Sequence, residues 1–105
     1  MRRFNDHLFD PTTGELWFQE QPIPLQSQPA RLLELLTENS GRMVSRDTIR
    51  EQLWDEATHV DFDRCLNFYI RQLRIALGDS ARSPRFIETL PKRGYRFLAR
   101  VDDDA

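Results

Sequence analysis

The segment 63–77, DRCLNFYIRQLRIAL, constrains the fold most, because it predicts a helix with one narrow apolar stripe. At about 100° per residue, the stripe consists of Leu66, Ile70, Leu73 and Leu77. This side must pack against other elements, so the opposite side is expected to be exposed. The exposed side presents Arg64, Phe68, Arg71, Gln72 and Ile75, with Asn67 and Arg74 on one flank. Gly78 is expected to end the helix.

Positive charge is concentrated in the last third of the chain. Residues 64–100 contain nine Arg or Lys and two acidic residues, a local net charge of +7. The remaining residues contain six basic and fifteen acidic residues, so the formal net charge of −2 conceals a polarised molecule. Because the Debye length is only about 8 Å at physiological salt, a ligand responds to the local charge more than to the total. A basic helix followed by a basic hairpin suggests two arms that face a polyanion.

Short apolar segments separated by turn residues predict an N-terminal antiparallel sheet, then three helices and a C-terminal hairpin. Strands are expected at 4–9, 15–19 and 23–25. One helix is expected at 27–38, a second from an N-cap at Ser45 to about Trp54, and a third at 63–77. The hairpin strands are expected at 86–90 and 95–101. A polar loop at 55–61 precedes the third helix. The expected fold class is α+β, with residues 1–105 as one domain that has its core at about 4–101 and an acidic, solvated tail at 102–105.

The composition excludes several classes of function. A single cysteine, Cys65, excludes an internal disulfide, and with two separated histidines it provides no metal-ligand spacing, so we expect no metal and no cofactor. His7 is expected at the surface or at a strand end. No catalytic motif stands out, so we expect no enzymatic activity. No apolar run approaches the roughly 18 residues of a membrane span and no signal peptide is evident, so the segment is expected to be cytoplasmic, without membrane contact.

The exposed side of helix 63–77 carries side chains suited to reading nucleic-acid bases. Arg can bridge two acceptors on a guanine edge or bind a phosphate, and Gln can pair with an adenine edge. Phe68 can meet a thymine methyl group, although single exposed apolar residues also need no explanation. The alternative for the arginines is a solvated face of ion pairs. It is disfavoured because residues 64–77 contain no acidic residue.

Several spaced motifs occur along the chain: LLELL at 32–36, GRMVSR at 41–46, LW at 53–54, IRQLRIALGD at 70–79, IET at 87–89 and RGYRF at 93–97. Together they resemble the OmpR/PhoB-type winged-helix DNA-binding domain. The resemblance implies a winged helix-turn-helix with an N-terminal antiparallel sheet, three helices and a C-terminal β-hairpin, the wing. It also implies sequence-specific binding of double-stranded DNA by a bacterial transcriptional regulator, with helix 63–77 in the major groove and the wing 86–101 near the minor groove.

Carried over by position, the resemblance makes ten residues candidates for DNA contact: Arg64, Asn67, Phe68, Tyr69, Arg71, Gln72 and Arg74 on the helix, Thr89 as a phosphate donor, and Lys92 and Arg93 in the wing. Many members have basic residues where this chain has Gln72 and Ile75, and the stretch 90–93, LPKR, replaces a common Val-Arg-Gly pattern. The charge of the wing therefore moves by one or two residues. The loop 55–61 aligns with a segment that touches RNA polymerase in some members, but its polarity is equally normal for an exposed connection.

Alternatives remain for function and architecture. One alternative is a winged-helix protein-interaction module, in which the acidic first half would bind a partner. Binding of structured RNA is disfavoured because the deep, narrow major groove of A-form RNA does not admit a helix. Response regulators of two-component phosphorelays carry a receiver domain before the winged helix. If Met1 is native, we expect no receiver before it, which leaves a stand-alone regulator or the N-terminal domain of a membrane-tethered CadC- or ToxR-like regulator. One recognition helix reads few base pairs and no dimer motif is present, so we expect a free monomer and a tandem dimer on DNA.

Overall fold

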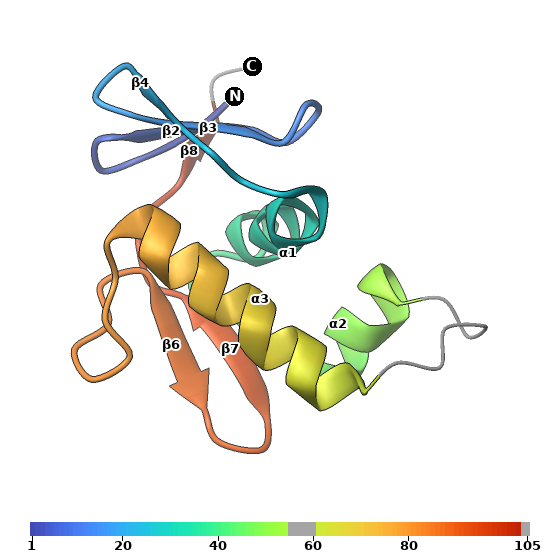
Figure 1. Ribbon diagram of the computed structural model, residues 1–105. Coiled ribbons are helices and arrows are strands. Elements are labelled where there is room, and N and C mark those ends of the chain that lie inside the picture. The colour runs from blue at the N-terminus through green and yellow to red at the C-terminus, as the bar shows by residue number, and fades with distance from the viewer. Residues whose placement is uncertain (55–60, 104–105) are drawn as a thin grey trace.

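The protein consists of two antiparallel sheets with three helices between them, an α+β fold (Figure 1). The computed structural model describes residues 1–54 and 61–103. The elements in chain order are β1 (Arg2–Phe4), β2 (His7–Asp10), β3 (Glu15–Phe18), β4 (Gln21–Ile23), α1 (Ser27–Glu38), β5 (Met43–Ser45), α2 (Arg46–Leu53), α3 (Phe62–Leu77), β6 (Ile87–Leu90), β7 (Gly94–Phe97) and β8 (Asp102–Asp103). The expected winged-helix architecture is confirmed.

The N-terminal sheet differs from the prediction at two places. The predicted single strand 4–9 is a hairpin of β1 and β2, in which Phe4 pairs with His7 across a two-residue turn. Asn5 begins this turn with a φ of 51°, a conformation that Asn tolerates better than most residues. The third strand is at 21–23 rather than 23–25, and it accommodates Pro22 because β4 lies at the edge of the sheet.

The predicted solvated tail at 102–105 is wrong for its first two residues. Asp102 and Asp103 form β8, which pairs with β1 opposite Arg3 and Arg2, respectively. Both aspartates remain exposed, so their sequence shows only the polarity of the side chains and not the pairing of the backbone. The first and last described strands therefore lie side by side at one end of the molecule (Figure 1).

The helix boundaries follow local capping signals. The helix α1 covers the predicted range 27–38. Ser45 caps α2 as predicted, because its Oγ accepts a hydrogen bond of 3.0 Å from the backbone N–H of Thr48. The helix α3 starts one residue earlier than predicted, after Asp61, whose carboxylate accepts from the N–H of Arg64. It ends at Gly78, which adopts the left-handed conformation expected there.

A second sheet, with the order β5-β7-β6, packs below the helices (Figure 1). Its strand β5 was not predicted, because three residues before a helix carry no periodic signal. The wing consists of β6 and β7, and β7 ends at Phe97 rather than at Val101. Beyond it, the N–H of Leu98 donates to the carbonyl of Phe86, so the chain leaves the hairpin there.

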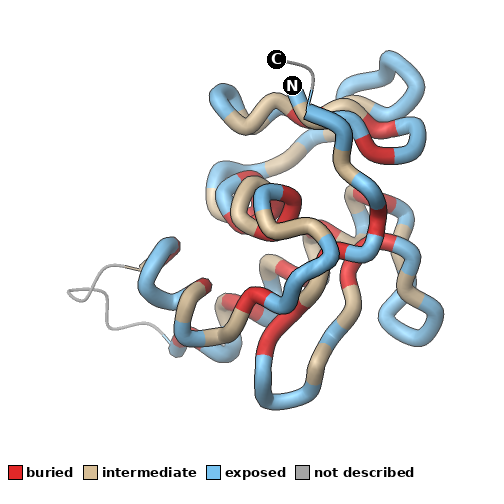
Figure 2. The backbone as a smooth tube through the Cα atoms, turned by 180° about the vertical axis from the view of Figure 1, so that it is seen from behind, coloured by how far each residue is buried: buried red, intermediate tan, exposed pale blue. Residues whose placement is uncertain are grey.

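The core lies between the two sheets and is filled from every element around it (Figure 2). The helix α1 is central, because it contacts α2, α3 and β7. Its Leu32, Leu33 and Leu36 are fully buried. The stripe predicted on α3 is also buried, with Leu66, Ile70, Leu73 and Leu77 all between 0% and 3% exposed. Burial of this stripe fixes which side of α3 faces outward.

His7 begins β2, so its predicted position at a strand end is confirmed, but the alternative position at the surface is wrong because His7 belongs to the core. Its side chain is only 4% exposed and lies among Phe4, Phe18 and Phe86, with ring centroids between 4.9 and 5.3 Å away. Phe86 is distant in sequence, so no local pattern could reveal this cluster. Desolvation by burial lowers the pKa of His7 below its ordinary value of 6.5, and nearby Arg85 lowers it further while Asp6 opposes the change.

We expect the free energy of unfolding to fall as the pH drops below about 6.5, because the unfolded chain binds a proton at His7 that the folded chain does not. Above that pH, His7 is neutral in both states and contributes no slope. His7→Phe, which keeps an aromatic ring in the cluster, should remove up to about 1.4 kcal/mol per pH unit of this fall. Urea denaturation at several pH values between 7.5 and 5.5 measures both slopes. Equal slopes in the two proteins would contradict the prediction.

Candidate nucleic-acid interface

The outer side of α3 carries an uninterrupted set of exposed side chains: Arg64, Asn67, Phe68, Arg71 and Ile75. Phe68 is 50% exposed and Ile75 is 67% exposed, although both are large and apolar. Within residues 1–54 and 61–103, the guanidinium groups of Arg64 and Arg71 have no hydrogen bond or ion pair. This side therefore offers free cationic donors next to exposed apolar groups.

Arg74 differs from the other arginines of α3, because it is tied to the wing. One Nη of its guanidinium donates to the carbonyl of Ile87 at 3.0 Å and to the Oγ1 of Thr89 at 2.8 Å. Its Nε is buried and has no partner. Arg74 thus links the last turn of α3 to β6, which the sequence could not indicate. Arg74 is also predicted to contact DNA directly. These hydrogen bonds to β6 restrict the positions that its guanidinium can take for such a contact.

A groove of about 490 Å³ separates α3 from the wing. Asn67, Arg71 and Arg74 line it from the helix, and Thr89 and Tyr95 line it from the strands. The hydroxyl of Tyr95 donates to Oδ1 of Asn67 at 3.4 Å. Since Thr89 already accepts from Arg74, its own hydroxyl hydrogen remains free to donate to an acceptor in the groove. Tyr95 belongs to this site through its hydroxyl although its ring is buried, and it was not among the residues that the sequence suggested for DNA contact.

Tyr69 and Gln72 lie on the other flank of α3, and both are only partly exposed. The ring of Tyr69 packs against Trp54 with centroids 5.7 Å apart and against Phe68 at 5.9 Å. Tyr69 therefore positions α3 against the segment that follows α2 and supports the exposed ring of Phe68. The structure brings Gln72 to the same flank, away from the wing groove.

The wing turn presents Lys92 and Arg93 as exposed side chains without a hydrogen bond or ion pair in the described part of the chain. The turn is closed by the N–H of Arg93, which donates to the carbonyl of Leu90 at 2.9 Å. Lys92 has a φ of 64°, which is costly for a residue with a Cβ. In Figure 1, this turn and the N-terminal end of α3 both lie at the end of the molecule opposite the two termini.

Two arginines of α2 lie near the N-terminal end of α3, and they were missed because they lie in the acidic part of the sequence. Arg46 pairs with Asp63 of α3 at 2.6 Å, and this hydrogen bond raises the pKa of Arg46 further. The guanidinium groups of Arg46 and Arg50 lie 5.8 and 5.2 Å from the centroid of the Phe62 ring. Arg50 therefore adds positive charge near the N-terminal end of α3, whereas the charge of Arg46 is balanced by Asp63.

Ion pairs in and after the wing neutralise other basic residues, which are therefore less available to an anionic ligand. The Nε of Arg96 donates to Glu88 at 2.8 Å across the hairpin, and Arg100 pairs with Asp102 at 3.3 Å. On α3 and the wing strands, the cations without a hydrogen bond or ion pair in the described residues are Arg64, Arg71, Lys92 and Arg93; Arg50 of α2 also has none. Residues 55–60 of the loop 55–61, which is either a contact for RNA polymerase or an ordinary exposed connection, lie outside the described residues.

Other classes of site were also sought. In residues 1–54 and 61–103, no group of three or more His, Cys, Asp or Glu is arranged to hold a metal ion. Over the same residues, no helix has the length and apolar character that crossing a membrane requires.

The chain matches the family model described as "Transcriptional regulatory protein, C terminal" over residues 20–97. It is 36% identical over 97 residues to the cholera toxin transcriptional activator of Vibrio cholerae, which covers 90% of this chain and 33% of that protein. It is also 36% identical over 85 residues to the transcriptional regulatory protein YxdJ of Bacillus subtilis, which covers 81% of this chain and 36% of that protein. The chain thus spans about a third of the length of these curated relatives.

Solved structures of similar fold cover nearly the whole chain. The DNA-binding domain of E. coli CadC has a TM-score of 0.79 at 26% identity and covers 96% of this chain and 94% of its own. The DNA-binding domain of Klebsiella pneumoniae RstA, in complex with the RstA box, has a TM-score of 0.78 at 25% identity and covers 91% of this chain and 94% of its own.

We expect Arg74→Met to lower the free energy of unfolding by about 1 to 3 kcal/mol, because Ile87 and Thr89 lose a charged donor in a partly buried position. Arg71→Met is the matched control, since Arg71 lies one turn away on the same helix and has no partner among the described residues. It should change stability by less than about 0.5 kcal/mol. Chemical denaturation compares the two. Equal effects would show that the link between α3 and β6 contributes nothing to stability.

Proposed function

We propose that this chain, which belongs to the OmpR/PhoB-type family of transcriptional regulatory protein C-terminal domains, is the sequence-specific DNA-binding module of a bacterial transcriptional regulator. The observation that carries the proposal is that arginines without a protein partner lie beside exposed side chains suited to reading bases, all on one side of one helix. Arg64 and Arg71 flank Phe68 on the outer side of α3, whose opposite side is fully buried. The similarity to the DNA-bound domain of RstA supports the same interpretation.

In the proposed complex, α3 enters the major groove and the wing lies over the adjacent minor groove. Arg64, Asn67, Phe68, Arg71 and Gln72 face base edges or flanking phosphates. Thr89 donates its free hydroxyl hydrogen to a phosphate, and Lys92 and Arg93 approach the minor groove from the tip of the wing. Tyr69 acts mainly as the support of Phe68, and Arg74 holds the two arms in register. Pro91, Lys92 and Arg93 replace the residues common in the family, so the depth of the wing in the groove is specific to this chain.

Selection of bound sequences from random duplex DNA tests the proposal first, because the experiment itself identifies the preferred operator. The selected sequence then serves for a salt titration. If each of the four free cations of α3 and the wing displaces about one counterion, the slope of log K against log salt has a contribution of about −3.6. A protein-interaction module would select no sequence and would show no such slope on DNA.

Arg64→Ala with Arg71→Ala should reduce the magnitude of the salt slope by about 1.8 and abolish selection of a preferred sequence. Fluorescence anisotropy with a labelled duplex measures both effects. Arg100→Ala is the control, because Arg100 is exposed, pairs only with neighbouring Asp102 among the described residues and lies two residues before β8, which pairs with the N-terminal strand β1. An unchanged slope in a folded Arg64/Arg71 variant, or an equal loss in the control, would contradict the proposal.

Two copies are proposed to bind head to tail on direct repeats. The molecule has a longest extent of 38 Å, close to the roughly 34 Å of one DNA turn, so neighbouring copies spaced by about 10 base pairs would lie against each other. We expect a monomer in free solution and tighter binding to direct than to inverted repeats. Sedimentation with and without such duplexes measures this. A stable dimer without DNA, or a preference for inverted repeats, would exclude the tandem arrangement.

A further inference from the structure

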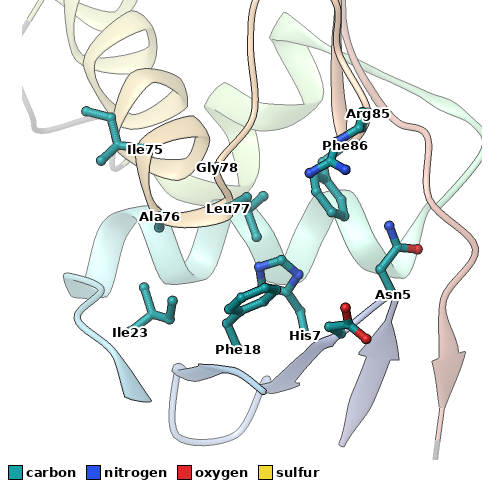
Figure 3. A pocket seen from close by; sticks show the side chains of 11 residues that line it. Asn5, His7, Phe18, Ile23, Ile75, Ala76, Leu77, Gly78, Arg85 and Phe86 are labelled. Carbon is teal, nitrogen blue, oxygen red and sulfur yellow. The ribbon is translucent and has the colours of Figure 1, made fainter. Parts of the chain in front are cut away.

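A second hollow, which shares only Ile75 with the lining of the wing groove, lies between the N-terminal sheet, the last turn of α3 and the segment that precedes β6 (Figure 3). Its volume is about 350 Å³, within the range of small-molecule sites. It is lined from three separate parts of the chain, so any occupant would touch the base of the wing and the end of α3 together. The proposed DNA contacts do not use this hollow.

The walls are apolar and partly open to solvent. Phe18 is 37% exposed and Ile75 is 67% exposed, and both line the hollow together with Ile23 and the buried ring of Phe86. Figure 3 shows these side chains arranged around a common space. Exposed apolar groups that converge on a cavity gain free energy when a planar apolar body covers them.

Two polar groups of the hollow, on His7 and Arg85, have no hydrogen-bond or ion-pair partner among the described residues. The His7 side chain is 96% buried, yet its Nδ1 has no hydrogen-bond partner among the described residues. Buried polar atoms are nearly always paired, so such an atom beside a cavity marks a site that is incomplete without an occupant. Arg85 lies at the rim, where its guanidinium is 5.5 Å from the centroid of the Phe86 ring and has no ion pair in the described part of the chain.

The charges at the rim decide the class of ligand. Asp6 also borders the hollow, but its carboxylate accepts from Gln19 Nε2 at 3.4 Å, and its backbone carbonyl accepts from the N–H of Gln19 at 3.0 Å. Arg85 keeps its fork of donors free, and that fork matches the two oxygens of a carboxylate. An anionic group is therefore favoured where it reaches Arg85 and lies away from the Asp6 carboxylate, whose charge the neutral amide of Gln19 does not remove.

We propose that this hollow binds a small planar carboxylate, with its apolar ring between Phe18 and Ile75 and its carboxylate on the guanidinium of Arg85. The imidazole of His7 forms a polar part of the lining. The site adds a ligand to a domain whose proposed function requires only DNA, and it is independent of that function.

Binding of 2-naphthoate to the 105-residue chain, followed by amide chemical shifts in NMR, tests the proposal. A ligand of this size should bind with a dissociation constant on the order of 1 mM, and the shifts should concentrate at Phe18, at Ile75 to Gly78 and at Phe86. The neutral analogue 2-naphthamide has the same ring and should bind at least about fivefold more weakly. Equal binding of the two compounds, or shifts spread over other surfaces, would overturn the proposal.

Arg85→Gln should weaken the binding of 2-naphthoate about tenfold and leave the binding of 2-naphthamide unchanged. Arg82→Gln is the matched control, because Arg82 is an exposed arginine of the same connection that does not line the hollow, and it should have no effect. Both substitutions are at exposed positions, and the dispersion of the amide spectrum reports folding. Unchanged affinity in Arg85→Gln would overturn the proposal. The proposal would also be overturned if the same amide shifts changed with protein concentration in the absence of ligand. Such changes would show that a second copy of the chain occupies the hollow.

Discussion

The position of the wing depends on the absence of a side chain at Gly94. A Cβ at this position would overlap the carbonyl oxygen of Val44 and lie 2.9 Å from the Cα of Ser45. The close approach lets Ser45 pair with Gly94 in the sheet while the Ser45 side chain caps α2, and it lets the N–H of Arg46 donate to the carbonyl of Arg93 at 3.0 Å. The start of α2 and the turn of the wing are therefore held together by backbone contacts that any larger residue would break.

From this fixed base, α3 and the wing behave as one unit. Arg74 joins the helix to two residues of β6, and the hydroxyl of Tyr95 joins β7 to Asn67 of the same helix. These contacts use one arginine that could otherwise face a ligand. Because of this link, the distance between the two DNA-facing arms is set before binding, which reduces the conformational entropy lost on binding. The groove between them therefore has a defined width in the free protein.

Local signals predicted the parts of the fold that local physics determines. The apolar stripe of α3, the range of α1, the cap at Ser45 and the left-handed Gly78 were all confirmed, because each depends on residues within one or two turns. The short strands β5 and β8 were missed because their partners, β7 and β1, lie far away in the sequence. The residues of the candidate site could be predicted, or were missed, for the same reason. Exposure of Arg64 and Phe68 follows from helical geometry, whereas the burial of His7 and the partners of Arg74 exist only after the sheets have packed against the helices.

The wing turn shows a conflict between stability and charge. The turn requires a left-handed residue between Pro91 and Arg93, and glycine is the residue that adopts this conformation without steric cost. Lys92 occupies it instead, at a cost of roughly 1 kcal/mol. Nothing within the described residues offsets that cost, since the Lys92 ammonium has no partner there. A strained, exposed and unpaired lysine at the tip of a hairpin supports the proposed contact with the minor groove, which would use its charge.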